Sequence, residues 1–120
     1  MRLRDVLTVA CAQTLTPNPD LDREIKWGFA SDLMSDVLRF DVTQGLLITG
    51  LTNPQIIRTA EMADVAAVLI VRGKAPLPET VQLARQAGVP ILSTDLIMFE
   101  ACGQLYAAGL PACIRSADGS

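Results

Sequence analysis

Residues 64–110 alternate short apolar runs with polar stretches of helical length, and this alternation restricts the chain to few folds. Residues 66–71 form an uninterrupted apolar run, and Val89–Leu92 form a second one. Pro78–Ala87 lies between them with the composition of a helix, and Gly88 suits the left-handed end of that helix. Strands joined by helices need crossover connections, so we expect these strands to be parallel, with right-handed connections.

The rest of the chain continues the same pattern. The expected helices cover Arg2–Ala10, a stretch near residues 33–40, residues 54–63, and a stretch from Thr94 or Asp95 to about Ala108. The expected strands cover Cys11–Leu15, Trp27–Ala30 and Gly45–Gly50, with turns at Thr16–Asp20 and Asp41–Gln44. Ser31 or Asp32 caps the helix whose apolar positions are Leu33, Val37 and Leu38, and Thr52-Asn53 places a capping residue before Pro54.

Gly45–Gly50 and residues 66–71 show no polar–apolar alternation, as strands covered by helices on both faces require. Together with the strand near residue 90 they predict a small layered α/β domain, with a mostly parallel central sheet flanked by helices. At 120 residues, half of them hydrophobic, the chain has enough residues for one core. We expect a single domain over residues 1–112 and a flexible carboxy-terminal tail over residues 113–120.

The composition excludes several kinds of site and partner. The chain has no histidine, and Cys11, Cys102 and Cys113 lack the spacing of a metal site or a disulfide framework. We therefore expect no metal and no cofactor. The net charge of −3 argues against a nucleic-acid partner. The apolar runs fall far short of the roughly 20 residues of a membrane helix, and no export signal is visible, so we expect a cytoplasmic protein with no membrane partner.

Ligands of open parallel sheets usually bind beyond the carboxyl ends of the strands, where the connecting loops converge. In this chain those loops contain glycines for close backbone approach, hydroxyl and amide groups for a sugar or phosphate, and cations for an anion. The predicted ligand-binding residues are Thr49, Gly50, Thr52, Asn53, Arg72, Gly73, Ser93 and Thr94, with Lys74 and Asp95 nearby. Because the same residue types also serve as helix caps and turn residues, the alternative of ordinary loops stays open.

Other reactive side chains have simpler interpretations, and we predict no catalytic residue. Asp32 and Asp36 are four residues apart and could share a helix face as acid–base or metal-binding carboxylates, but we favour solvated side chains. Cys11 and Cys102 are interpreted as buried structural thiols, because no histidine is available to activate them. Trp27 could stack on a ligand, although filling a gap in the core or in a dimer is the favoured reading.

The last expected helix has one unusually small side, next to an apolar stripe. The small residues are Ala101, Cys102, Gly103, Ala107, Ala108 and Gly109, and the stripe consists of Phe99, Leu105 and Tyr106. Small residues allow a helix to approach a neighbour or a symmetric copy closely, and two-fold dimers are the commonest oligomers. We expect a homodimer.

Particular stretches of the chain resemble the DRTGG domain. The similarity is carried by Leu21–Glu24, Trp27–Val37, Gly45–Gly50 and Gly88–Thr94, and it extends over about residues 1–110. The DRTGG domain occurs alone or joined to CBS domains and to phosphotransacetylases. Its closing segment is similar to the non-catalytic amino-terminal domain of HPr kinase/phosphorylase. The resemblance implies a layered α/β fold, a role other than catalysis, and association in pairs.

The residues that give the family its name are altered in this chain. The family pattern has an Asp-Arg pair in the loop after one central strand and Thr-Gly-Gly in the loop after the next. Here Leu51 and Thr52 replace the pair, and only Gly73 remains of the triplet. Asp22-Arg23 spells the same pair but lies too early in the chain. The departure implies a different ligand, or none.

Two functional hypotheses follow from these observations. In the first, the domain is a non-catalytic regulatory or ligand-sensing module that binds a nucleotide or another anionic metabolite and changes the packing of a dimer or of a partner enzyme. In the second, it is a purely structural adaptor between proteins. A third hypothesis, an enzyme that uses Asp32 and Asp36, is ranked below both.

Overall fold

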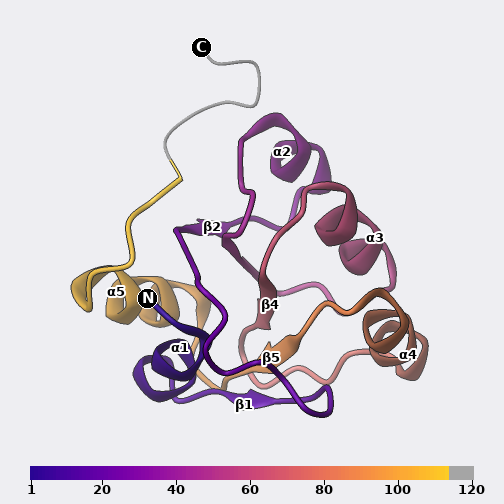
Figure 1. The fold of residues 1–120 in the computed structure, drawn as a ribbon, viewed down its shortest axis with the longest axis horizontal. Coiled ribbons are helices and arrows are strands. Elements are labelled where there is room, and N and C mark those ends of the chain that lie inside the picture. Colours follow the sequence, from indigo (N-terminus) through magenta and orange to yellow (C-terminus); the bar gives the residue numbers. More distant parts are fainter. Residues whose placement is uncertain (114–120) are drawn as a thin grey trace.

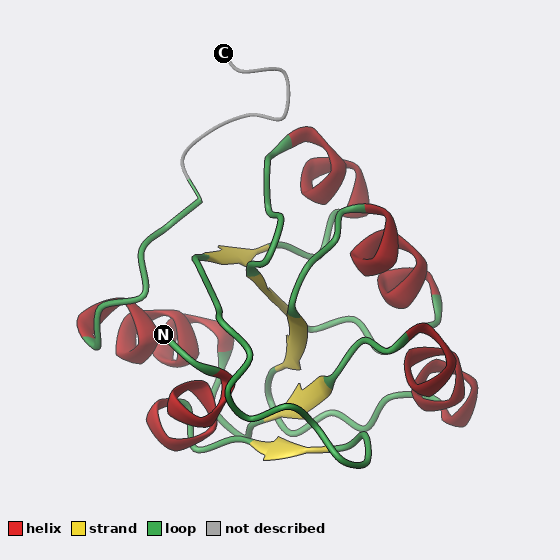
Figure 2. Ribbon diagram, viewed as in Figure 1, coloured by secondary structure: helices red, strands yellow, loops and turns green. Residues whose placement is uncertain are grey.

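The computed structural model describes residues 1–113 and contains a five-stranded sheet with helices on both faces (Figures 1 and 2). The strands are β1 (Gln13–Thr14), β2 (Gly28–Ala30), β3 (Leu46–Thr49), β4 (Ala67–Ile70) and β5 (Ile91–Ser93). The helices are α1 (Leu3–Val9), α2 (Met34–Arg39), α3 (Gln55–Met62), α4 (Pro78–Ala87) and α5 (Met98–Ala107). The predicted fold class is confirmed.

The strands lie in the order β1-β5-β4-β3-β2. Strands β2 to β5 are mutually parallel, as the strand–helix alternation predicts, whereas β1 is an antiparallel edge strand beside β5. Thr49 of β3 lies opposite Ile70 of β4, and Ile70 lies opposite Ser93 of β5. The loops that follow these three strands therefore leave the sheet at the same edge.

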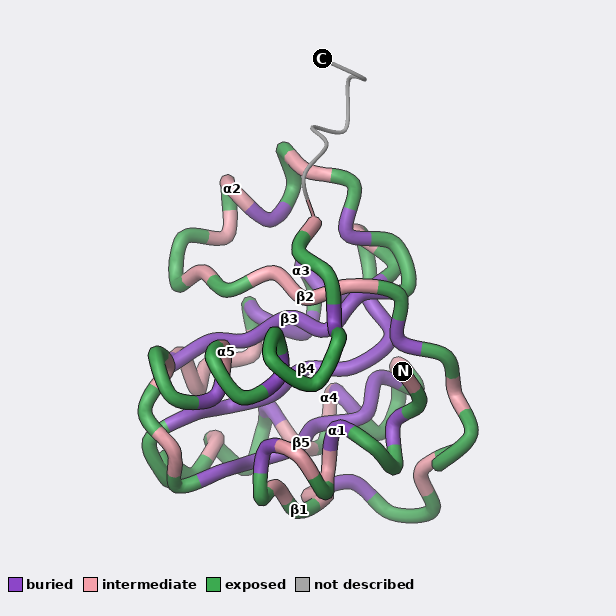
Figure 3. The backbone as a smooth tube through the Cα atoms, turned by 90° about the vertical axis from the view of Figure 1, so that its left-hand side faces the viewer, coloured by how far each residue is buried: buried purple, intermediate pink, exposed green. Residues whose placement is uncertain are grey.

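The sheet separates two hydrophobic cores. Figure 1 shows α1 and α5 on one face and α2, α3 and α4 on the other. Alternate residues of the central strands point to opposite faces, with Leu46, Ile48, Ala67 and Leu69 in the first core and Leu47, Val68 and Ile70 in the second. All of β3 and β4 is buried, as the tube in Figure 3 shows. Burial on both faces explains the continuous apolar runs in the sequence.

The first predicted strand is shorter than expected, and the prediction of a buried Cys11 is wrong. Cys11 has a left-handed φ of 51° and is exposed. It lies in the turn that ends α1, where the Ala12 N–H donates to the Leu7 carbonyl at 2.9 Å. The chain becomes extended only at Gln13, because this turn must reverse its direction before β1 can pair with β5.

Helix starts were only partly predictable. Pro78–Ala87 is confirmed as α4, ended by Gly88 with a φ of 72°. The Asn53 side chain accepts a hydrogen bond from the Gln55 N–H at 3.0 Å, although the helix itself begins one residue later than Pro54. The caps expected at Ser31 or Asp32 and at Thr94 or Asp95 are absent, since α2 and α5 begin after Leu33 and Ile97.

Helical spacing gave the wrong buried face in two helices. Of the predicted apolar positions of α2, Leu33 and Leu38 are 59% and 45% exposed, and only Val37 is buried. In α5, Leu105 is buried, whereas Phe99 and Tyr106 are 84% and 70% exposed. The interpretation of Phe99 and Tyr106 as part of one stripe with Leu105 is therefore wrong.

Trp27 fills a gap within the chain itself. A β-carbon on Gly45 would lie 2.7 Å from Trp27 Cδ1 and 2.9 Å from the Val42 carbonyl oxygen, so Gly45 gives the indole ring its place. The indole Nε1 is buried and has no hydrogen-bond partner among the described residues. This packing agrees with the favoured interpretation of Trp27 as a gap-filling residue.

The chain after α5 returns to the sheet. The Gly28 N–H donates to the Pro111 carbonyl at 2.9 Å, and the Cys113 N–H donates to the Gly28 carbonyl at 3.1 Å, beside the outer edge of β2. Most of the expected flexible tail, residues 114–120, lies outside the described residues, and the domain boundary at residue 112 stays a prediction. Within the described part of the chain, no helix has the length and apolar character needed to cross a bilayer.

Candidate ligand site at the carboxyl ends of the strands

The three predicted loops meet at one edge of the sheet, which we call the rim (residues 49–53, 72–74 and 93–95). Backbone hydrogen bonds hold the loops together. The Val71 N–H donates to the Thr49 carbonyl, and the Gly73 N–H donates to the Thr94 carbonyl at 2.8 Å. The structure thus brings together three loops that are separated along the chain by a strand and a helix each.

Asp32 belongs to the rim, although the sequence suggested only a helix cap or a solvated carboxylate. Its Oδ1 accepts hydrogen bonds from the Gly50 N–H at 2.7 Å and from the Thr49 hydroxyl at 2.8 Å. The Gly50 hydrogen bond, the Thr49 hydroxyl and the nearby charges of Arg72 and Lys74 lower the pKa of the Asp32 carboxyl, against some opposing desolvation. This carboxylate is therefore ionised at neutral pH.

Arg72 lies over Gly50. A β-carbon on Gly50 would lie only 2.7 Å from Arg72 Nη2, so glycine leaves the space that the guanidinium occupies. Arg72 itself has a left-handed φ of 66°, and its N–H donates to the Leu96 carbonyl at 2.8 Å. The side chain is exposed, and neighbouring Lys74 adds a second exposed cation. A group bound here would meet the positive charges of Arg72 and Lys74 beside the Asp32 carboxylate.

Gly73 lets the Asp95 side chain approach the backbone closely, as Gly50 does for Arg72. Its φ is 63°, and a β-carbon there would lie 2.7 Å from Asp95 Oδ1. Because the N–H groups of Arg72 and Gly73 are both bonded within the protein, they are not available to an anion. An anion at the rim would therefore be held without the N–H groups of Arg72 and Gly73.

The remaining predicted site residues differ in what they can offer. The Thr94 side chain is buried, and its hydroxyl donates to the Ala10 carbonyl at 2.6 Å, so it joins the rim to α1. Ser93 is 9% exposed. Thr52 and Asn53 are half-buried, and the Thr52 carbonyl accepts from the Thr80 hydroxyl at 2.7 Å. Thr52 and Asn53 are thus more accessible to a ligand than Thr94.

The carboxylates and thiols considered in the sequence analysis lie apart from one another in roles that the structure makes plain. Among residues 1–113, no group of three or more carboxylates and thiols is arranged to hold a metal ion. Asp32 already accepts two hydrogen bonds, and Asp36 lies in the first turn of α2. Burial raises the pKa of the Cys102 thiol, which keeps it protonated and weakly nucleophilic at neutral pH.

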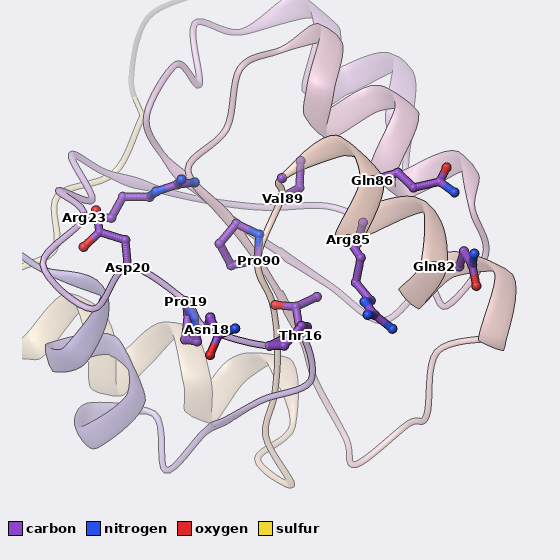
Figure 4. A pocket seen from close by; sticks show the side chains of 13 residues that line it. Thr16, Asn18, Pro19, Asp20, Arg23, Gln82, Arg85, Gln86, Val89 and Pro90 are labelled. Carbon is purple, nitrogen blue, oxygen red and sulfur yellow. The ribbon is translucent and has the colours of Figure 1, made fainter.

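A cavity of about 630 Å³ lies at the opposite end of the sheet (Figure 4). The sequence analysis did not predict this cavity. It is bounded by the Thr16–Asp20 turn on one side and by the last turns of α4 on the other. Figure 4 shows Arg85 extending from α4, while Gln82 and Gln86 point away from Pro90. Arg23 is partly committed to structure, since its Nη1 donates to the Ala66 carbonyl at 2.9 Å.

The family model of the DRTGG domain matches residues 5–107, which is most of the chain. The chain belongs to the DRTGG domain family. The family match confirms the resemblance carried by the segments around residues 21–37, 45–50 and 88–94. No curated protein matches the chain significantly.

A solved structure shares the fold of this DRTGG domain. It is described as the CBS and DRTGG domains of the regulatory region of Clostridium perfringens pyrophosphatase, complexed with its activator, diadenosine tetraphosphate. The superposition has a TM-score of 0.68 at 15% sequence identity and covers 98% of this chain. It covers 51% of the other chain, so the present chain spans about half the length of that regulatory region.

Proposed function

We propose that this DRTGG domain is a non-catalytic, ligand-sensing regulatory module that binds a nucleotide or another small anionic metabolite at the rim. The observation that carries the proposal is the meeting of Gly50, Arg72 and Lys74 around one ionised carboxylate, Asp32. The activator-bound regulatory region of the clostridial pyrophosphatase, which contains a domain of the same fold, supports a regulatory role.

The charges of the rim suit a ligand with two kinds of polar group. Arg72 and Lys74 would pair with a phosphate, since charge-assisted hydrogen bonds are the strong ones. Asp32 uses Oδ1 for two internal hydrogen bonds, and its Oδ2 lies beside the space over Gly50 that the Arg72 guanidinium occupies. That second oxygen would accept hydrogen bonds from sugar hydroxyls. Thr52 and Asn53 would add contacts from the neighbouring loop.

The module would act by population shift. A ligand that binds one packing arrangement more tightly than another changes the balance between the two, either for two copies of the domain or for the domain and a partner enzyme. We propose a homodimer as the basic unit. We also propose a cytoplasmic location, because Cys11, Cys102 and Cys113 are odd in number and widely spaced in the sequence, as is usual in reducing compartments.

Titration calorimetry with AMP, ATP and diadenosine tetraphosphate tests the proposal. At least one of these probes should bind the wild-type chain, and Arg72→Gln should weaken binding by about 10- to 100-fold, the effect of losing one charge-assisted pair. Arg85→Gln is the matched control, because Arg85 is an exposed arginine on α4 that lines the cavity at the opposite end of the sheet. Absence of binding by all three probes, or equal losses in both variants, would contradict the proposal.

The alternative function is a structural adaptor that docks a partner enzyme without a small ligand. Two observations favour it: Leu51 and Thr52 replace the Asp-Arg pair of the family, and the N–H groups of Arg72 and Gly73 are used within the protein. Copurification distinguishes the two functions. An adaptor would keep its partner after Arg72→Gln but lose it after disruption of α5.

A further inference from the structure

The cavity opposite the rim, which we call the α4 cavity, has the size of a ligand site. It is bounded by residues 16–20, by Arg23 and by the last turns of α4 with the segment that follows them. Its volume of about 630 Å³ falls within the range of about 300–1,000 Å³ that is typical of small-molecule sites. It shares no residue with the rim.

The walls of the α4 cavity are held in place by the protein itself. Asn18 has a left-handed φ of 50° and lies between two prolines, whose rings fix their own φ angles. The Thr16 hydroxyl accepts a hydrogen bond from the Ile91 N–H at 3.3 Å, which ties this wall to β5. The opposite wall ends at Gly88, the left-handed cap of α4. A ligand would thus meet a preformed cavity.

Two arginines line the α4 cavity without a carboxylate partner. Arg23 is half-buried, and Arg85 is exposed in the last turn of α4. Among residues 1–113 neither forms an ion pair, and the Arg23 guanidinium has only the Ala66 carbonyl as an acceptor. Figure 4 shows the two guanidinium groups on opposite sides of Pro90. Because a half-buried cation without a counter-charge is unfavourable, a bound anion would stabilise this arrangement.

The carboxylates near the α4 cavity do not neutralise these arginines. Asp20 lines the cavity, but its Oδ1 accepts a hydrogen bond from the Asp22 N–H at 3.1 Å, and Figure 4 shows the carboxylate turned away from Pro90. A neighbouring hollow that shares Arg23 contains Glu24, Glu61 and Asp64. These three carboxylates would repel an anion there. An anion that pairs with Arg23 should therefore lie on the α4 side.

The end of α4 adds hydrogen-bond acceptors to the cavity. The Gly88 and Val89 N–H groups both donate to the Ala84 carbonyl. In the part of the chain that the structure describes, the carbonyls of residues 85–87 consequently receive no N–H. They carry partial negative charge, which favours hydroxyl groups over a bare anion. The Asn18 amide on the opposite wall can donate or accept a hydrogen bond.

We propose that the α4 cavity is a second ligand site, which binds a small polyhydroxylated dianion, a sugar derivative with a carboxylate or a phosphate at each end. Arg23 and Arg85 would each hold one end, since a guanidinium pairs with either group through two hydrogen bonds. The hydroxyl groups between the ends would bond to the last carbonyls of α4 and to Asn18. A nucleotide fits less well, because no aromatic ring lines the cavity for a base to stack on.

Titration calorimetry of the full chain tests this site with two dianions. Glucarate is a sugar diacid, and glucose bisphosphate has a phosphate at each end, so the tighter of the two identifies the anionic group. At least one should bind the wild-type chain. The corresponding ligand with one charged end, gluconate or glucose monophosphate, should bind about 10-fold more weakly or worse. Adipate, a diacid without hydroxyl groups, should be weaker than the better dianion by a similar factor.

Arg85→Gln should weaken binding of the better dianion by about 10- to 100-fold, the effect of losing one charge-assisted pair. The variant should fold normally, with unchanged circular dichroism, because Arg85 is exposed and forms no ion pair among the described residues. Arg39→Gln is the matched control, since Arg39 is an exposed arginine on α2 that does not line the α4 cavity.

Three results would overturn the second site. They are no binding of either dianion, equal losses in Arg85→Gln and Arg39→Gln, and binding of adipate or of a ligand with one charged end as tightly as the better dianion. Nucleotide binding that is lost in Arg72→Gln and kept in Arg85→Gln would leave the rim standing in each case. Failure of the second site is therefore distinguishable from failure of the proposed function.

Discussion

At the scale of single residues, Asp32 shows what the sequence could and could not reveal. Its position after a short strand predicts a helix cap, and many aspartates have that role. The structure instead uses the carboxylate to join β2 to the end of β3, through Gly50 and Thr49. Only knowledge that β2 lies beside β3 would have placed Asp32 at the rim, and three residues of strand carry too weak a signal for that.

Removal of this carboxylate should destabilise the domain in a pH-dependent way. Asp32→Ala leaves the Gly50 N–H and the Thr49 hydroxyl without their acceptor, which should cost about 1 kcal/mol of unfolding free energy at pH 7. Because the folded-state pKa of Asp32 is lowered, its contribution is complete above the unfolded value near 3.8 and is lost as the pH falls through the folded value.

Urea unfolding of the wild type and Asp32→Ala at pH 7 and pH 3 measures this effect. The difference between the two proteins should shrink at pH 3, while Glu61→Ala, an exposed carboxylate on α3, should change little at either pH. A difference that grows on acidification would refute the assigned role of the Asp32 charge.

At the scale of elements, the sequence predicted a strand or helix correctly where its apolar pattern allowed only one interpretation. Residues 66–71 are too short for a buried helix and have no alternation, so a strand covered on both faces was the remaining choice. In α5, by contrast, Met98, Phe99, Ala101, Cys102, Leu105 and Tyr106 surround most of the helix with apolar side chains. Helical spacing alone could not decide which of them face the core.

The two-sided burial of β4 has a measurable consequence. Leu69 packs in the core beneath α1 and α5, and Ile70 packs in the core beneath α3 and α4. Leu69→Ala and Ile70→Ala should each lower the unfolding free energy by about 2–5 kcal/mol, because each leaves a cavity on a different face. Chemical denaturation measures both, with Leu77→Ala as the control at a 43% exposed leucine. A small effect from either core variant would show that one face is loosely packed.

At the scale of the whole molecule, the alternation of strands and helices predicted the parallel order and the shared rim, but not the surface beside β2. That surface depends on Gly28 and Ala30 leaving room next to α5, and on Leu110–Ala112 returning to the sheet. None of these contacts is local in the sequence. Phe99 is only three residues beyond Leu96, whose carbonyl accepts the Arg72 N–H. The rim and the surface beside β2 are therefore connected by one short segment.

This connection predicts that ligand binding and pairing are coupled. If a nucleotide at Arg72 shifts the segment that leads into α5, then it changes the dimer dissociation constant, and pairing must change nucleotide affinity by the same factor. Couplings of this kind typically amount to about 5- to 150-fold. Sedimentation equilibrium with and without the nucleotide that binds in calorimetry gives the first factor, the change in the dimer dissociation constant.

Calorimetry at protein concentrations above and below the measured dimer dissociation constant gives the second factor, the change in nucleotide affinity on pairing. Thermodynamic reciprocity requires the two factors to agree, and Arg72→Gln should abolish the effect of nucleotide on pairing without breaking the dimer itself. Two unequal factors would show that nucleotide binding and pairing are not linked through a single equilibrium. Two factors equal to one would mean that nucleotide binding and pairing are independent, in which case binding at Arg72 would not be transmitted through residues 94–97.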